Sequence, residues 1–238
     1  MKDLYCWQSK FKICDYSSKL INKIIALNDH NSNKVHLDKI KKALYYAKKY
    51  HGTQKRDTGE PYYSHPIEVA YMVSDYIFNT DILVTCILHD VIEDTAFTKD
   101  LIKHLFGPVV AEQVDSLTRI KQDRKYSVPY VLNLLCKQKQ EDLLLVKYFD
   151  RLHNLQSLKI KPPAKQRKII LETLKEFLPL AAHLGLLVSE NQLGKLCANI
   201  NISLKELSAE ETPAFSFVDN YQPLLLAFQN AKHQMYNQ

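Results

Sequence analysis

The chain has 238 residues, of which 46% are hydrophobic and 24% are charged, and its formal net charge is +6. This size and composition indicate a globular protein that is large enough to bury a hydrophobic core. No apolar run approaches the length of a membrane span, and Lys10, Lys12 and Asp15 interrupt any signal-peptide core near the start. We therefore expect a cytoplasmic protein with no membrane partner.

The cysteines and the basic residues exclude two further classes of protein. The five cysteines are widely spaced and form no CxxC pair, which argues against a disulfide framework or a zinc ribbon. Lysines and arginines are spread along the chain, so they indicate either a solvated basic surface or attraction toward a small polyanionic substrate. No zinc-finger spacing or RNP-like aromatic motif is present, and no nucleic-acid partner is expected.

Helical periodicity and turn signals predict an all-α protein. Residues 1–33 are an N-terminal extension of unknown role, with a short amphipathic helix over 20–25 and a loop over 29–33. Helices are then expected over residues 34–50, 66–78, from a cap at Thr80 or Asp81 to residue 88, 98–107, 108–118, from Ser127 onward, 141–158, 164–183 and 219–235. Glycines at 52, 107 and 185 mark helix ends.

An unusual group of polar residues follows an apolar run in the segment CILHDVIEDT, residues 86–95. His89 and Asp90 stand side by side, and Glu93 and Asp94 follow about one helical turn later. Placing such groups near a core is costly unless they have a compensating partner such as a metal ion. A solvated helix end is the alternative interpretation of this segment taken alone.

Two other stretches carry residues of the same kind. His65 precedes Pro66 at the expected start of a helix, and Asp150 follows an apolar run on another helix. His153 and Asn154, at i+3 and i+4, share a helix face with Asp150. A divalent metal site is therefore predicted from two histidines and two aspartates: His65, His89, Asp90 and Asp150. These ligands suit manganese, iron or zinc, and their spacing does not choose among the three.

The order of these residues resembles a known family. The two histidines and two aspartates are similar to the H…HD…D signature of HD-superfamily metal-dependent phosphohydrolases. The words QKRDTGEPY, SHP, LHDVIEDT and KYFDRLHNLQSL, in one order over residues 34–196, resemble the hydrolase domain of the RelA/SpoT family. The resemblance implies a helical bundle around a single metal site, with one Mn²⁺ as the cofactor. It implies a hydrolase domain over residues 34–200, followed by a C-terminal helical extension over 201–238.

The resemblance also implies roles for residues around the metal. In the family a Glu-Asp pair assists the attacking water, so Glu93 is the candidate general base and Asp94 its partner. Contacts with the substrate are implied for four residues: Arg56, Thr58, Asn154 and Ser157. Thr58 stands where the family usually has Ser, and Ser157 where it has Thr. Asp57 stands where a Lys is common, a charge reversal at a position that can contact phosphate or base.

The implied reaction is hydrolysis of the 3′-pyrophosphate of ppGpp or pppGpp, which gives GDP or GTP and pyrophosphate. Since the chain ends before a nucleotide-synthesising domain would fit, we expect a hydrolase without synthetase activity, similar to small stand-alone alarmone hydrolases. Two alternatives stay open. One is an HD phosphohydrolase acting on another nucleotide, such as the 2′-phosphate of NADPH or an adenine alarmone. The other is a non-catalytic nucleotide-sensing module.

Overall fold

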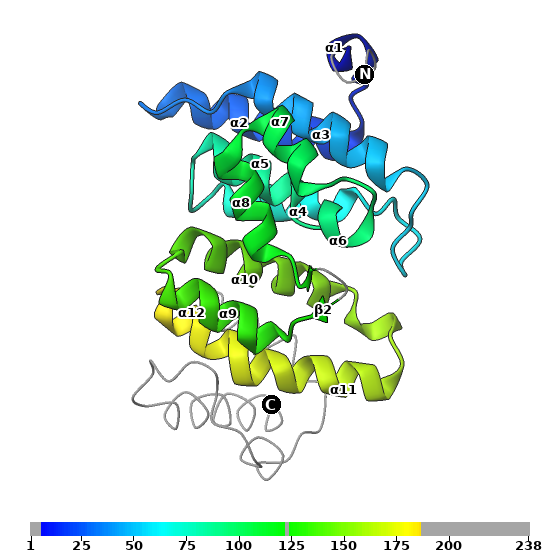
Figure 1. The fold of residues 1–238 in the computed structure, drawn as a ribbon, viewed down its shortest axis with the longest axis vertical. Helices are drawn as coiled ribbons and strands as arrows, with labels where there is room; N and C mark the ends of the chain where they lie inside the picture. The colour runs from blue at the N-terminus through cyan, green and yellow to red at the C-terminus, as the bar shows by residue number, and fades with distance from the viewer. Residues whose placement is uncertain (1–5, 122–123, 187–238) are drawn as a thin grey trace, which may run out of the picture.

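Helix α10 (Glu141–Gln156) crosses the middle of the molecule, with the helices of residues 7–117 on one side of it and the helices over 128–137 and 163–183 on the other (Figure 1). The computed structural model describes residues 6–121 and 124–186. Its other α-helices are α1 (Trp7–Lys10), α2 (Asp15–His30), α3 (Leu37–His51), α4 (Ser64–Val73), α5 (Thr80–Leu88), α6 (Val91–Asp94), α7 (Lys99–Phe106), α8 (Pro108–Leu117), α9 (Val128–Lys137), α11 (Pro163–Glu172) and α12 (Leu178–His183). The prediction of an all-α fold is confirmed.

Helix α10 is central because its sequence is apolar on every side near its start. Residues 143–146 are all buried, and α10 packs against α4, α8, α9 and α12. Helix α5, whose residues 82–88 are all buried, packs against α3, α4 and α8. These two helices hold the ends of the apolar runs in the interior, which is where the polar residues of the predicted metal site follow.

The segment before the predicted hydrolase domain is part of the same hydrophobic core. Helix α2 is longer than the predicted 20–25 and packs against α3 and α4 through the buried residues Leu20, Ile21 and Ile24. The domain limits of 1–33, 34–200 and 201–238 stay predictions, and the helix expected over 219–235 lies outside the described residues.

Most helix boundaries follow local signals. Thr98 and Ser127 cap α7 and α9 with their hydroxyls, and the Gly107-Pro108 pair separates α7 from α8. The cap of α5 was predicted wrongly: it is Asn79, whose side-chain oxygen accepts from the backbone N–H groups of Asp81 and Ile82. Thr80 instead accepts a hydrogen bond from the backbone N–H of His36 at 3.0 Å, so its hydroxyl has another partner.

Replacing Asn79 by Ala should lower the free energy of unfolding by about 1 kcal/mol, because two N–H groups at the start of α5 lose their acceptor. Urea denaturation followed by circular dichroism measures the change. Asn79→Asp keeps an acceptor at the same position and should stay close to wild type. Equal losses in the two variants would show that the capping oxygen is not what stabilises this helix start.

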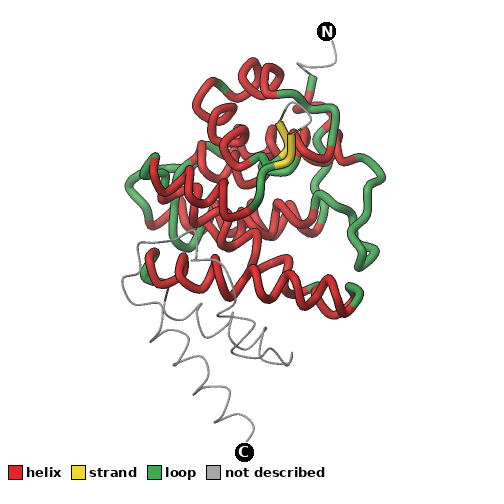
Figure 2. Tube along the Cα trace, turned by 60° about the horizontal axis from the view of Figure 1, so that its bottom comes forward, coloured by secondary structure: helices red, strands yellow, loops and turns green. Residues whose placement is uncertain are grey.

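Two features of the fold have no counterpart in the predicted elements. The first is a short antiparallel hairpin of two-residue strands, β1 (Ile120–Lys121) and β2 (Arg124–Lys125), drawn in yellow in Figure 2. The second lies within the single helix expected over 164–183, where a π-helical segment, Thr173–Phe177, joins α11 to α12. Gly185, with a φ of 68°, follows the end of α12 as predicted. Within the described ranges, no helix is both long and apolar enough to cross a membrane.

Candidate metal centre

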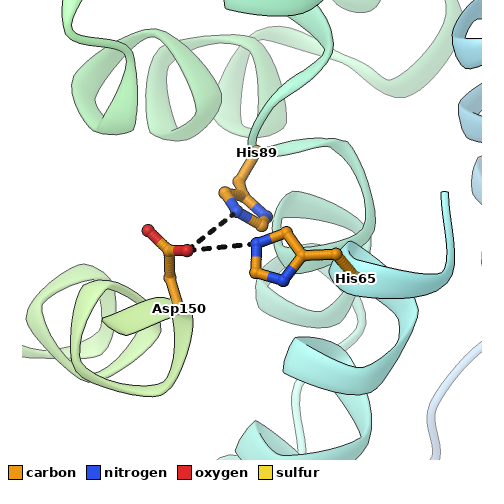
Figure 3. Close-up of side chains that lie close together, drawn as sticks. All are labelled: His65, His89 and Asp150. Carbon is orange, nitrogen blue, oxygen red and sulfur yellow. Dashed lines mark hydrogen bonds and ion pairs between the residues drawn. The ribbon is translucent and has the colours of Figure 1, made fainter. Parts of the chain in front are cut away.

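Three helices bring the predicted metal ligands together. His65 is the second residue of α4, His89 directly follows α5, and Asp150 lies on α10 (Figure 3). Asp150 Oδ1 is 3.1 Å from His65 Nε2 and 3.8 Å from His89 Nε2, and one ligand atom of each of the three residues lies within 4.8 Å of the others. Both histidines are buried. The carboxylate and the two imidazoles therefore converge from separate parts of the chain.

Asp90 joins the same cluster. Its Oδ1 is 3.1 Å from His89 Nε2 and its Oδ2 is 3.6 Å from His65 Nε2. All four residues predicted as ligands thus lie close together, with Asp90 beside the three whose ligand atoms converge. Their role as ligands stays a prediction, while their proximity is a property of the fold.

The hydrogen bonds around the two histidines leave Nε2 of each ring facing the cluster. His89 Nδ1 is 2.8 Å from the carbonyl oxygen of Cys86, so this nitrogen donates a proton and Nε2 is the nitrogen that could bind a cation after losing its own proton. His89 Nε2 is buried and has no hydrogen-bond partner among the described residues. His65 Nδ1 is 2.8 Å from His153 Nδ1, which leaves His65 Nε2 facing Asp150. Two such imidazoles with two carboxylates make a site that fits a divalent metal.

The charges of the cluster shift the pKa values of its members. Burial alone would lower the pKa of His89, but the carboxylates of Asp90 and Asp150 raise it to about 9. Burial would raise the pKa of Asp150, yet its contacts with His65 and His89 hold it well below its usual value. Burial, together with the nearby His65 and Arg56, lowers the pKa of His153 to about 3. His153 is therefore neutral at physiological pH and suited to orient His65.

Acid should destabilise the metal-free protein partly through His153. In the folded state this ring stays neutral down to a pKa of about 3, whereas in the unfolded chain it takes up a proton below roughly pH 6.5. The stability it confers is thus fully present above roughly pH 6.5 and is lost as the pH falls toward 3. Urea midpoints measured across this range should fall less steeply for His153→Asn than for wild type.

The matched control for this pH dependence is His30→Asn, because His30 is exposed at the end of α2. It should leave the pH dependence of the urea midpoint as it is in wild type. If His153→Asn and wild type lose stability in parallel, His153 does not contribute to the acid sensitivity.

The two acidic residues after the HD pair have different neighbours. Glu93 accepts a hydrogen bond from the backbone N–H of Arg119. Asp94 Oδ2 accepts one from the Tyr62 hydroxyl at 2.7 Å, and the same hydroxyl lies 3.2 Å from Asp90 Oδ2. Partial burial and the charge of Asp90 raise the pKa of Asp94, although the Tyr62 hydrogen bond opposes this rise. Asp94 is therefore connected to the metal cluster through one hydroxyl, whereas Glu93 is held by the start of the hairpin.

Three of the four predicted substrate-binding residues lie together. Arg56 Nη2 donates to Asn154 Oδ1 at 3.1 Å and to Ser157 Oγ at 3.4 Å, and Asn154 Nδ2 donates to Asp150 Oδ1 at 2.7 Å. Asn154 thereby joins Arg56, in the loop between α3 and α4, to the metal cluster. Thr58 is exposed in a turn of the loop that carries Arg56. All four roles in substrate binding stay predictions.

A cavity of about 280 Å³ adjoins the metal cluster at Asp150. The described residues that line it include four basic side chains and two acidic ones: Arg119, Lys147, Arg151, Lys161, Asp150 and Glu172. Arg151 pairs with Glu172, as expected for a partly buried arginine, and Lys161 Nζ is 2.6 Å from Asp57 Oδ2. Basic side chains thus outnumber acidic ones along this cavity, although most of them have an acidic partner, and such a lining beside a metal site is suited to a phosphorylated ligand.

Two residues near the metal cluster were not among the predicted site residues. Lys147 is buried on α10, and its Nζ lies 4.0 Å from Asp150 Oδ2. A lysine inside an otherwise apolar run, three residues before Asp150, is the sequence signal that would have identified it. Tyr62 touches both Asp90 and Asp94, and its signals in the sequence were its place at the end of the motif QKRDTGEPY and its nearness to His65.

Comparisons with known proteins agree with this geometry. The HD domain family matches residues 43–187, more than half of the chain. A protein of Brucella ovis named GTP pyrophosphokinase rsh is 37% identical over 163 residues, which cover 66% of this chain and 22% of that protein. A guanosine-3′,5′-bis(diphosphate) 3′-pyrophosphohydrolase of Aquifex aeolicus is 35% identical over 161 residues, which cover 66% of this chain and 23% of that protein.

The match to these relatives covers less than a quarter of their own length. A solved structure of a metazoan ortholog of SpoT aligns with 82% of this chain and 95% of its own, at 21% identity and a TM-score of 0.49. The RSH/SpoT-type names of the relatives agree with the resemblance seen in the sequence motifs. The chain belongs to the HD domain family.

Proposed function

We propose that this chain hydrolyses the 3′-pyrophosphate of ppGpp and pppGpp, with Mn²⁺ as its cation, to give GDP or GTP and pyrophosphate. The observation that carries the proposal is the convergence of His65, His89 and Asp150, with Asp90 within 3.6 Å of both histidines, beside a cavity lined by more basic than acidic side chains. Asp94 is one hydroxyl away. The name of the Aquifex aeolicus relative supports the choice of substrate. A nucleotide substrate also fits the expected small-molecule partner and cytoplasmic location.

The residues divide the reaction between them. His65, His89, Asp90 and Asp150 would hold the cation. When bound, the cation supplies Lewis-acid chemistry, which acidifies water and offsets charge on phosphoryl oxygens. Asp94 or Glu93 accepts a proton from the attacking water, whose oxygen forms a bond to the phosphorus attached to the ribose 3′ oxygen. The bond between that phosphorus and the 3′ oxygen breaks, the 3′ oxygen takes up a proton to become the 3′-hydroxyl of GDP or GTP, and pyrophosphate is released.

The basic residues beside the metal cluster position the nucleotide. Arg56 has hydrogen-bond donors in a planar fork that matches a phosphate, and Asn154 and Ser157 keep this fork directed toward the α10 side of the site. Lys147 and Arg151 contribute positive charge to the cavity wall. These groups favour a substrate that carries several phosphates.

One observation favours a second candidate substrate. Asp57, at a position where a Lys is common in the resembling family, forms an ion pair with Lys161. This pair reduces the positive charge available to a phosphate at this edge of the cavity. An HD phosphohydrolase acting on another nucleotide, such as NADPH at its 2′-phosphate or an adenine alarmone, is therefore the alternative to test.

The test is incubation of the purified protein with ppGpp and Mn²⁺, with and without a chelator, while GDP and pyrophosphate are followed by chromatography. NADPH and an adenine alarmone are run in parallel, and Asp90→Ala is the inactive control. Metal-dependent release of pyrophosphate from ppGpp supports the proposal. Turnover of NADPH but not of ppGpp would show that the substrate is a different nucleotide. A separate incubation with ATP and GTP tests the expectation that the protein has no synthetase activity.

A further inference from the structure

Tyr62 connects two carboxylates that have different proposed roles. Its hydroxyl is 2.7 Å from Asp94 Oδ2 and 3.2 Å from Asp90 Oδ2. Asp90 is a proposed metal ligand, and Asp94 belongs to the proposed water-activating pair. A phenol has one proton to donate, so both carboxylates depend on the position of the same group.

The ring that carries this hydroxyl is held in place on its other side. It stacks on the ring of His51, with a centroid distance of 4.8 Å and an interplanar angle of 27°. His51 is buried, with 1% of its surface exposed, and its Nδ1 is 2.8 Å from Gln54 Oε1. The backbone N–H of Tyr62 donates to the carbonyl oxygen of Gln54 at 2.9 Å. The hydroxyl is therefore directed by the fold and needs no rearrangement to reach the two aspartates.

The side-chain amide of Gln54 also holds the backbone of Asp94. Gln54 Nε2 donates to the carbonyl oxygen of Asp94 at 2.7 Å. His51, Gln54, Tyr62 and Asp94 thus form a closed ring of contacts between the end of α3 and the end of α6. A structure that holds Asp94 by both its carbonyl and its carboxylate restricts where this side chain can point.

We infer that Tyr62 is a positioning residue that sets Asp94 relative to Asp90 and so couples cation binding to activation of the attacking water. Without the hydroxyl, Asp90 loses the partner that orients one of its oxygens, and the two carboxylates repel each other with no donor between them. The cation-binding half of this inference stands on the metal cluster alone. The water-activation half rests on the proposed function.

The test is Tyr62→Phe, which keeps the ring that stacks on His51 and removes only the hydroxyl. Calorimetric titration of the metal-free protein with MnCl₂ should show an affinity about 10–100-fold weaker than that of wild type. In the ppGpp assay at saturating Mn²⁺, kcat should fall by about the same factor while KM stays within roughly threefold. A purely structural role would lower the melting temperature instead, which scanning fluorimetry measures.

Tyr63→Phe is the matched control, because it removes a tyrosine hydroxyl one residue away that interacts with Cys14 instead of the two aspartates. It should leave the Mn²⁺ affinity and kcat unchanged. Wild-type Mn²⁺ affinity in Tyr62→Phe would overturn the inference, even if kcat falls. If wild type does not hydrolyse ppGpp but Tyr62→Phe still binds Mn²⁺ more weakly, the proposed substrate is wrong and the role of Tyr62 in cation binding stands. Failure of wild type to bind Mn²⁺ would overturn both.

Discussion

Asp150→Asn should abolish cation binding and hydrolysis while the protein stays folded. The substitution keeps the shape of the side chain but removes the charge that faces His65 and His89 across 3.1 and 3.8 Å. Loss of an outer partner of a metal ligand costs about 10–100-fold in affinity, so loss of a ligand charge should cost more than about 100-fold. Without the cation, several kcal/mol of charge stabilisation in the transition state disappear. The rate of hydrolysis should therefore fall by at least about 10³-fold.

Calorimetric titration with MnCl₂ and release of pyrophosphate from ppGpp measure the two effects. Asp142→Asn is the matched control, since it makes the same change on the same helix at an exposed position in the first turn. It should leave both quantities within about twofold of wild type, as expected for a surface substitution. If Asp150→Asn still binds Mn²⁺ with wild-type affinity, Asp150 is not a ligand and the cation must be held by other residues.

Phe97→Ala should give a large loss of stability. Phe97 is 1% exposed and stacks on Tyr50, with a centroid distance of 4.3 Å and an interplanar angle of 7°, and on Tyr46 at 5.7 Å. Truncating a buried aromatic side chain costs about 3–5 kcal/mol, through the lost contacts and the cavity left behind. For a chain of this length the melting temperature should fall by roughly 10 °C.

Thermal unfolding followed by circular dichroism checks this expectation. The control is Tyr130→Ala, because Tyr130 is aromatic but 52% exposed, and its loss should cost no more than about 1 kcal/mol. Phe97 also contacts the residue that follows α6, since its backbone N–H donates to the Thr95 hydroxyl at 3.0 Å. Equal melting temperatures for Phe97→Ala and wild type would show that the packing of Phe97 against Tyr46 and Tyr50 does not stabilise the fold.

Features of the fold that depend on local chemistry could be predicted from the sequence. Gly107 followed by Pro108 is such a case, because a residue at positive φ and a first-turn proline define a boundary without reference to the rest of the chain. Asn79, Thr80 and Asp81 are all good caps, so the local pattern did not choose among them. The hairpin of two-residue strands is too short to show alternation.

The candidate site divides in the same way. The grouping of His89, Asp90 and Asp150 was predictable because imidazoles and carboxylates that follow apolar runs need a partner, and His65 was added from its place at a helix start. The contacts of Tyr62 were not predictable, because Asp90 and Asp94 lie 28 and 32 residues away in the sequence and only the packing of the helices brings them to its hydroxyl. Arg56 reaches Asn154 across 98 residues, so its position near α10 also depends on the tertiary structure.

The residues facing the metal site come from α4, the end of α5 and α10, and His65 and Asp150 are 85 residues apart in the chain. An unfolded chain cannot present them together, so a cation that binds them binds the native state alone. By mass action, a cation at about 100 times its dissociation constant would add roughly 2.7 kcal/mol to the free energy of unfolding. The supply of metal would then govern how long the protein survives as well as how fast it turns over substrate, and chelation would expose it to unfolding and proteolysis.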